Sequence, residues 1–357
     1  MNIQAQIEFS RTSGFKLNTP LQVDHPGITA IYGQSGAGKS TLLRILAGLE
    51  RGSDQDNIDI RVDEQIWQDP NHFLAAEKRA IGVVFQNQHL FPHLSVRDNL
   101  LFALQRQHRP SPISLENIIT WFELGPLLDQ KVSLLSGGES QRAAIARVII
   151  NAPKIILMDE PLASLDYPAK QRILNCLKTL KEEFQIPIIY VSHQWDEITQ
   201  IADEVQYLQA GCISQKGDIA TMSTSFELGL YNGDSAAAVI YCEVIRQDKA
   251  YGLTQLNFEQ NDLFVNQLDQ SPGETVRLII SARDTSLVTE RPKASSILNI
   301  LEASVDNFLT EDRTTLVRLQ CGHQNLLARI TRKSADAMQI RKGQKLFAQI
   351  KATALTR

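Results

Sequence analysis

The chain has 357 residues and a formal net charge of −4, with 43% hydrophobic and 21% charged residues. These proportions are close to the globular average, which excludes a mostly disordered, collagen-like or coiled-coil chain. The length exceeds that of one average domain and predicts two or more. The four cysteines form no CxxC pair, which excludes a zinc knuckle by spacing. Because no apolar run approaches the roughly 18 residues that cross a bilayer and the first residues lack an export signal, we expect a soluble chain.

The charge is unevenly distributed along the chain. Residues 291–357 hold 12 Lys and Arg against 5 Asp and Glu, a local charge of +7, so the first 290 residues carry −11. A basic tail of this kind indicates a nucleic acid, an anionic ligand or merely a solvated surface.

Residues 27–52 carry the first local signature. Residues 27–33 are apolar, rich in β-formers, and end on a glycine, which predicts a strand. Apolar side chains then recur at helical spacing, at Leu42, Ile45, Leu46 and Leu49. Gly52 is placed to cap that helix after its last turn. The pattern predicts a strand, a loop and a helix.

The loop between this strand and this helix reads GQSGAGKS over residues 33–40 and matches G-x-x-x-x-G-K-[ST]. In such a loop backbone N–H groups point at phosphate oxygens, the lysine reaches the β- and γ-phosphates, and the following hydroxyl binds Mg²⁺. A plain glycine-rich turn is the alternative, but this match follows a strand and opens a helix. We therefore expect ATP and Mg²⁺ as ligands. The residues expected to bind the nucleotide are Gly33, Gln34, Ser35, Gly36, Ala37, Gly38, Lys39, Ser40 and Thr41.

A second apolar strand, residues 155–158, ends in two adjacent acids. This puts Asp159 at the sheet edge, where it can hold Mg²⁺ directly or through water, and Glu160 close enough to polarise an attacking water. Acids also terminate buried strands without further role, and without the P-loop that interpretation would be the better one. A third apolar strand covers residues 186–191. Apolar strands alternating with helices predict a parallel sheet covered on both faces.

The pattern changes in the last third of the chain. Short β-type stretches separated by Gly, Pro, Asn and Asp turns are typical of small barrels or sandwiches. They cover residues 238–245, 252–258, 276–280, 315–319, 326–330 and 345–350. We place the boundary between 218 and 236, which gives a first domain of residues 1–230 and a β-rich region of residues 236–357.

Residues 135–142, between the P-loop and the acidic strand, read LSGGESQR. Ser136 and Glu139 have capping-box spacing, so a helix should begin here, with two glycines whose N–H groups are open to an anion. A purely structural cap is the alternative. The sequence resembles the signature of ATP-binding cassette proteins, whose usual form has Gln in place of Glu139. The other family elements are also present, in the family's order along the chain: residues 84–86 resemble the Q-loop, 164–166 the D-loop and 191–193 the switch-histidine strand.

The resemblance implies an α/β P-loop NTPase fold, with a mainly parallel sheet and a helical subdomain, followed by a small all-β, OB-like domain. It further implies a homodimer in which two cassettes pack head to tail. In that dimer the nucleotide held by one subunit would face four residues of the other: Ser136, Gly137, Gly138 and Asp166.

The resemblance also assigns chemical roles. Glu160 would act as general base, His193 would contact the γ-phosphate, and Gln86 would sense Mg²⁺ and the attacking water. The residues at the metal would be Ser40, Gln86 and Asp159. The aromatic residue that usually stacks on adenine in this family has Phe15 as its nearest counterpart here.

Residues 86–104 resemble the importer members of the family, in which this region forms the groove for a cytoplasmic helix of the membrane subunit. A core segment is the alternative, but its polar interruptions favour a partly exposed surface. The tail segments 281–287, 295–299, 328–334 and 350–353 resemble the ATPases of molybdate importers. This implies a peripheral subunit at the cytoplasmic face of the bacterial inner membrane. Its partners would be integral membrane permease subunits and, through them, an external binding protein.

The same resemblance gives residues 291–357 a Mop-like, oxyanion-binding character. In related domains tetrahedral oxyanions are held by backbone N–H groups, hydroxyls and basic side chains, and the local charge of +7 suits that chemistry. Ordinary solvated lysines are the competing explanation. Our candidates are Ser296, Arg332 and Lys351, with molybdate or tungstate as a ligand that throttles the ATPase.

Two alternatives stay open at this point. One is a cassette ATPase that acts on nucleic acid, but the chain as a whole is not basic and its tail contains only Phe308 and Phe347 as aromatics, so we expect no nucleic-acid partner. The other is an importer of another cargo, such as sulfate, a sugar, a polyamine or iron.

Overall fold

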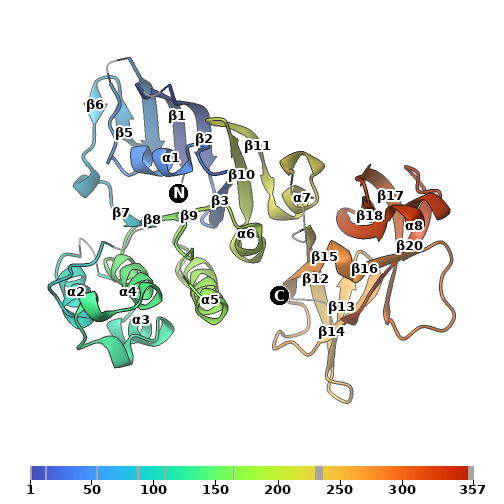
Figure 1. The fold of residues 1–357 in the computed structure, drawn as a ribbon. Helices are drawn as coiled ribbons and strands as arrows, with labels where there is room; N and C mark the ends of the chain where they lie inside the picture. The colour runs from blue at the N-terminus through green and yellow to red at the C-terminus, as the bar shows by residue number, and fades with distance from the viewer. Residues whose placement is uncertain are drawn as a thin grey trace. The chain divides into compact units, whose positions relative to one another are not determined.

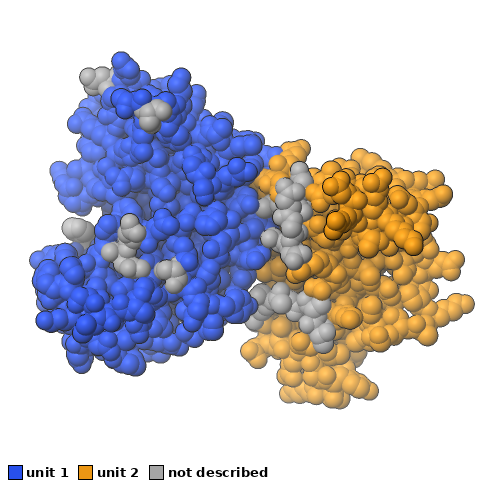
Figure 2. Space-filling view, viewed as in Figure 1, with its two compact units in different colours: residues 1–217 blue, residues 218–357 orange. Residues whose placement is uncertain are grey.

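The computed structural model describes residues 2–12, 14–53, 55–86, 89–107, 110–163, 165–229 and 236–352. They divide into two compact units, residues 1–217 and residues 218–357, each with its own hydrophobic core (Figure 2). Residues 218–229 therefore group with the second unit. The limits expected for the two functional domains, 1–230 and 236–357, stay a prediction.

A six-stranded sheet forms the centre of the first unit, in the order β11-β10-β3-β9-β8-β7 (Figure 1). Its strands are β3 (Ile28–Tyr32), β7 (Ile81–Val84), β8 (Ile155–Asp159), β9 (Ile188–Ser192), β10 (Glu204–Gln209) and β11 (Cys212–Asp218). The strands from β10 to β7 pair in parallel. Every residue of β8 and β9 is buried, because alternate side chains enter cores on opposite faces of the sheet. The carboxyl ends of β3, β7, β8 and β9 thus meet at one edge.

An antiparallel sheet, β2-β1-β4-β5-β6, covers one side of the first unit. Its strands are β1 (Ile3–Ser10), β2 (Lys16–Val23), β4 (Asn57–Val62), β5 (Gln65–Asp69) and β6 (His72–Phe73). The strict alternation of buried and exposed residues in β1 and β2 shows that only one face is packed. That face and one face of the central sheet share a core with α1 (Lys39–Leu46).

The end of α1 differs from the sequence prediction. The helix ends at Leu46, and Gly48, with φ 73°, takes the left-handed position in place of Gly52. The N–H of Leu49 donates to the carbonyl of Arg44, the six-to-one bond of a Schellman motif. Leu49 is 45% exposed, so it lies outside the helix and off its buried stripe. The earlier of two glycines ends the helix.

A buried arginine also holds this end of α1. Arg79 is 1% exposed, and its guanidinium donates to the carbonyls of Ile45 and Leu46 at 3.0 and 2.8 Å. Further bonds reach the carbonyls of Leu74 and Trp67. Burial lowers the pKa of Arg79 to about 10. This one side chain ties the last turn of α1 to the antiparallel sheet.

Helices cover the other face of the central sheet. They are α2 (Val96–Leu104), α3 (Leu115–Trp121), α4 (Gly137–Ile150) and α5 (Tyr167–Phe184), which share a core with β8 and β9. A shorter helix, α6 (Trp195–Ile201), follows β9. None of the helices in the described residues combines the length and apolar character that a membrane span requires.

The second unit is built from two antiparallel sheets around a single core. One has the order β14-β13-β12-β15 and the other β16-β20-β17-β18-β19. The strands are β12 (Ala237–Asp248), β13 (Leu253–Phe258), β14 (Asn261–Asn266), β15 (Thr275–Ser281), β16 (Thr285–Val288), β17 (Asn299–Thr310), β18 (Thr314–Cys321), β19 (Gln324–Thr331) and β20 (Lys345–Ile350), with short helices α7 (Ile219–Ser223) and α8 (Arg332–Ala337). All six predicted β-stretches are strands, and the expected small all-β, OB-like fold is confirmed.

Two side-chain amide groups, one of them buried, join these sheets. Asn299 is fully buried, and its side chain accepts from the N–H of Phe264 and donates to the carbonyl of Phe264, at 2.7 and 2.9 Å. Gln324 makes the same pair of bonds to the backbone of Tyr241. In each case a side chain replaces the next strand of a ladder and satisfies backbone groups that would otherwise be unpaired.

Candidate nucleotide site

Residues 33–38 connect β3 to α1 along a path that needs glycine. Gly36 and Gly38 have φ angles of 82° and 107°, in the left-handed region that favours glycine. At Gly33 the constraint is space, because a Cβ atom there would lie 2.2 Å from the carbonyl oxygen of Leu208 on β10. The loop therefore follows a fixed path into the N-terminus of α1, where N–H groups are available to an anion.

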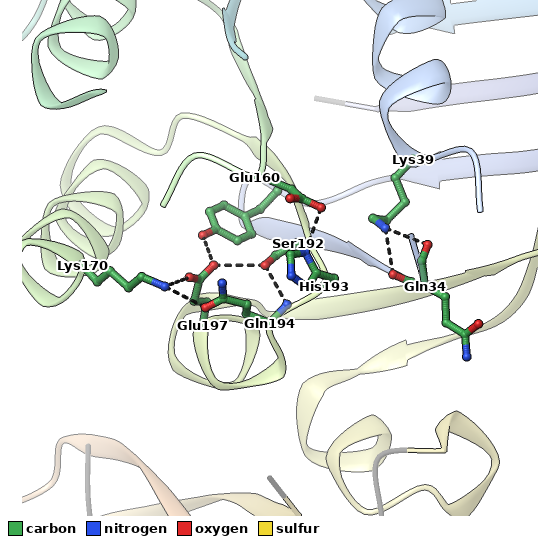
Figure 3. Close-up of polar contacts among 10 residues, drawn as sticks. Gln34, Lys39, Glu160, Lys170, Ser192, His193, Gln194 and Glu197 are labelled. Atoms are coloured by element: carbon green, nitrogen blue, oxygen red, sulfur yellow. Dashed lines mark hydrogen bonds and ion pairs between the residues drawn. The ribbon is translucent and has the colours of Figure 1, made fainter. Parts of the chain in front are cut away.

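Lys39, the first residue of α1, is only 5% exposed. Its Nζ donates to the carbonyls of Gly33 and Gln34, at 2.8 and 3.0 Å (Figure 3). Burial lowers the pKa of Lys39, and the nearby carboxylates of Glu160 and Asp159 partly oppose that shift. The ammonium group is therefore held within the loop and within electrostatic reach of both acids.

Asp159 ends β8 beside the first turn of α1. It is 9% exposed and accepts a hydrogen bond from the exposed Ser40, while burial raises its pKa. Its Oδ1 atom is buried without a hydrogen-bond partner among the residues that the structure describes. A buried carboxylate oxygen without a partner is costly unless a cation or a water completes it. The pair Ser40 and Asp159 therefore fits a Mg²⁺ ion.

Glu160 follows Asp159 with a φ of 46°, a left-handed conformation that is uncommon for a residue with a side chain. Its N–H donates to the carbonyl of Val191, and its Oε1 lies 2.9 Å from Nδ1 of His193 (Figure 3). His193 directly follows β9, and its side chain is 44% exposed. Backbone strain of this kind concentrates at functional sites, where it aims a side chain.

Gln86 reaches the same edge of the sheet from β7. Val84, the last residue of β7, pairs with Met158, so Gln86 and the strand end at Asp159 lie at the same edge of the sheet. Gln86 is exposed, so its side chain is accessible to a ligand. Of the D-loop, Ser164 lies outside the described residues, and Asp166 caps α5 by accepting from the N–H of Ala169.

The signature residues begin α4 instead of following a strand. Ser136 is the N-cap, and the predicted capping box is present: Glu139 accepts from the N–H and the hydroxyl of Ser136, both at 2.8 Å. These bonds from Ser136 lower the pKa of Glu139. The carboxylate at the position where the family usually has Gln thus fixes the Ser136 hydroxyl. Gly137 and Gly138 form the first turn of the helix.

Phe15 lies next to the P-loop. Its ring is half-buried, and a Cβ atom on Gly38 would lie 2.7 Å from its Cζ. Phe15, the nearest counterpart of the adenine-stacking aromatic, therefore lies against the phosphate-binding loop that precedes α1.

The three oxyanion candidates lie at two places in the second unit. Asn299 and Ile350 pair at one end of β17, which puts the exposed Ser296 and Lys351 near that end. Arg332 follows β19, whose last residue pairs with Thr314 beyond the other end of β17. Within one chain the strand register does not bring Arg332 to the other two.

Sequence reasoning missed a buried polar network beside His193. Glu197, on α6, is 4% exposed and accepts from Tyr190, Ser192 and Lys170 at 2.8, 3.0 and 2.9 Å (Figure 3). Lys170 donates also to the side-chain oxygen of Gln194, at 2.7 Å. The only feature of the sequence that could have indicated this network is spacing: Glu197 lies four residues after His193, and Lys170 lies four residues after Asp166.

Comparison with known proteins agrees with this geometry. Residues 18–163 match the family model "ABC transporter", and residues 295–356 match "TOBE domain". The chain is 39% identical to the Molybdenum import ATP-binding protein ModC of Methylococcus capsulatus over 96% of both chains. It is 41% identical to the protein of that name from Pseudomonas aeruginosa, again over 96% of both. The chain belongs to the ABC transporter family.

Solved structures of ABC cassettes resemble the first part of the chain. One is a dimeric post-hydrolysis state of an ATP-binding cassette bound to ADP and Pi, with a TM-score of 0.52 and 27% identity, covering 61% of this chain and 98% of that one. Another is a dimeric bacterial ABC transporter cassette, with a TM-score of 0.53 and 26% identity, covering 60% and 98%. The predicted α/β cassette fold is confirmed.

Proposed function

We propose that this chain is the ATP-hydrolysing subunit of a molybdate importer. The observation that carries the proposal is the group formed by Lys39, Asp159, Glu160 and His193, which three separate segments bring to one sheet edge. Full-length similarity to proteins named for molybdenum import supports the cargo.

The P-loop binds the phosphates. The N–H groups of residues 33–41 point at the phosphate oxygens, and the Lys39 ammonium exchanges the carbonyls of Gly33 and Gln34 for the β- and γ-phosphates. Ser40 and Asp159, joined by Gln86, would hold Mg²⁺. When bound, the ion neutralises charge on the β- and γ-phosphates. Phe15 packs beside the adenine.

Hydrolysis uses the residues that follow β8 and β9. Glu160 accepts a proton from the attacking water, and its contact with His193 keeps the carboxylate aimed at that position. His193 contacts the γ-phosphate. The arrangement works through positioning and charge neutralisation, without a covalent intermediate.

A second copy completes the site. Ser136, Gly137 and Gly138 of one subunit face the γ-phosphate bound by the other, with Asp166 at the interface. The capping box supports this arrangement because it orders the N-terminus of α4, where N–H groups favour an anion. The dimeric state of the two similar cassettes is a further support.

The membrane subunit binds in a groove of the first unit. A cavity of about 540 Å³ is lined by residues of β7, α2 and α4 and of the loops next to them, among them Phe91, Phe102, Arg106 and Arg147. Three of its lining residues, Phe91, Phe102 and Ala103, belong to residues 86–104. In this proposal the cavity accepts a short amphipathic helix of the permease. An external binding protein delivers the cargo, and the subunit stays peripheral at the cytoplasmic face of the inner membrane.

ATP turnover of the complex in proteoliposomes tests this function. We expect turnover to rise when the binding protein carries molybdate or tungstate and to stay basal with sulfate. Stimulation by sulfate or by a sugar alone would assign another cargo, and the absence of ATP turnover in every condition would overturn the ATPase assignment.

Regulation by oxyanion in the tail is a separate part of the proposal. Ser296, Arg332 and Lys351 bind molybdate or tungstate across two packed copies of the second unit, since one chain does not bring them together. Calorimetry on the full-length protein checks this. We expect heat of molybdate or tungstate binding in the wild-type protein and none in the triple alanine variant. Binding unaffected by those substitutions would remove these residues from the role.

A further inference from the structure

A segment of six residues connects three parts of the nucleotide site. Residues 192–197 run from the end of β9 into the first turn of α6. In this segment His193 contacts Glu160. Trp195 packs edge-on against Tyr32, the last residue of β3 before the P-loop, with 5.1 Å between ring centroids. Glu197 contacts Lys170 on α5.

Glu197 is the centre of this segment's polar contacts. Its Oε2 accepts from the hydroxyls of Tyr190 and Ser192, and its Oε1 accepts from the ammonium of Lys170. The Ser192 hydroxyl in turn accepts from the N–H of Gln194, the residue after His193. The side chain of the residue before His193 and the peptide N–H after it are thus held by bonds that converge on one buried carboxylate (Figure 3).

Lys170 carries these contacts to the helix that follows the D-loop. It lies in the first turn of α5, and its N–H donates to the carbonyl of Asp166, the N-cap of that helix. Its side chain bonds both Glu197 and Gln194, which flank Trp195. A shift of α5 is therefore transmitted to the His193 loop through these bonds, and a shift of that loop is transmitted to α5. Buried charge-assisted bonds such as these are costly to break singly.

We propose that Glu197 is a positioning residue that fixes His193 and the start of α5 in one arrangement, so that the γ-phosphate contact and the Asp166 segment are set together. This rests on the proposed ATPase function. Glu197 itself touches no substrate in this scheme and acts through His193 and Lys170.

Steady-state kinetics tests the proposal with Glu197→Gln and Lys170→Met, which remove the charge pair from either side. We expect kcat to fall by about tenfold or more while the KM for ATP changes by less than about twofold. Glu183→Gln, at an exposed acid of α5, is the matched control and should behave as wild type. A rise in KM with kcat unchanged would overturn the proposal.

A background lacking His193 separates positioning from general stability. If Glu197 acts through His193, adding Glu197→Gln to His193→Ala should lower turnover by much less than it does in the wild-type background. Equal fold losses in both backgrounds would assign Glu197 a purely structural role. If Glu197→Gln does not fold, Tyr190→Phe and Lys170→Met, which each remove part of the network, take its place.

Hydrogen exchange supplies a readout that needs no turnover. In Glu197→Gln we expect peptides covering residues 188–197 and residues 166–174 to exchange faster together, with other peptides unchanged. Faster exchange at 188–197 alone would contradict the link to α5. A wild-type protein that fails to hydrolyse ATP would count against the proposed function, and the exchange result would still decide the positioning role.

Discussion

The Oε1 atom of Glu160 lies 2.9 Å from Nδ1 of His193, and the two residues follow neighbouring parallel strands. The left-handed backbone at Glu160 aims its carboxylate at the histidine. The proposed base and its proposed orienting partner are therefore brought together by the parallel strand pairing and by one residue with a left-handed backbone.

Glu160→Gln should keep nucleotide binding and lose nearly all turnover. The amide has the same shape but cannot accept a proton, and general base catalysis contributes about 10²- to 10⁴-fold. ATP should then accumulate in the closed dimer, which size-exclusion chromatography detects. Near-normal hydrolysis would remove Glu160 from the role of base.

Lys39→Ala should weaken nucleotide binding itself. The variant loses the charge-assisted bonds to phosphate, a loss of roughly 10- to 100-fold in affinity. It also removes the partner that the carbonyls of Gly33 and Gln34 share. Titration with a fluorescent ATP analogue measures the effect, and unaltered affinity would exclude Lys39 from the phosphate site.

Asp159→Asn should stabilise the metal-free protein at neutral pH while it weakens Mg²⁺ binding. Burial raises the pKa of Asp159, so its ionised form is disfavoured in the folded state. For an acid with a raised pKa, the native state binds more protons than the unfolded state, and stability falls as pH rises from the ordinary value of 3.8 through the raised one.

The stability gain from Asp159→Asn should therefore grow with pH across that window and then level off. Urea unfolding with chelator present, from about pH 4.5 to about pH 8, measures it. A gain that shrinks as pH rises would contradict the assignment of burial as the cause. Asp24→Asn, at an exposed aspartate of the first unit, is the control.

Asn299→Ala should destabilise the second unit by about 2 kcal/mol, because the N–H and the carbonyl of Phe264 both lose their partner inside the protein. Asn266→Ala, at an exposed asparagine on the same strand as Phe264, should change the free energy of unfolding by less than about 0.5 kcal/mol. Equal effects of the two substitutions would show that the Asn299 amide bonds contribute nothing specific.

The sequence predicted those parts of the fold whose pattern is local. The P-loop, the acidic end of β8 and the capping box at Ser136 each occupy a few consecutive residues with a fixed chemical requirement. The antiparallel sheet of the first unit was missed. Its edge strand β2 contains Pro20, which argues against a strand, yet an edge position tolerates a residue without an N–H.

The rest depends on contacts between residues distant in sequence. Lys170 and Glu197 lie 27 residues apart and meet only because α5 and α6 pack together. Arg79 reaches carbonyls more than 30 residues earlier in the chain. No rule based on sequence spacing predicts these contacts. The predicted end of α1 was wrong for a different reason. Two glycines, Gly48 and Gly52, could end the helix, and the tertiary contacts of Arg79 favour Gly48.

Arg79 gives the short helix α1 a second anchor. Eight residues make little more than two turns, a length that does not persist alone in water. The proposed phosphate site lies at one end of this helix, and at the other end the Arg79 guanidinium donates to the last two carbonyls of the helix. Anion binding at the N-terminus of α1 therefore depends on the Arg79 guanidinium at its C-terminus, about 12 Å away. A lysine at position 79 would keep the charge and still release the helix, because one ammonium cannot span carbonyls from three segments.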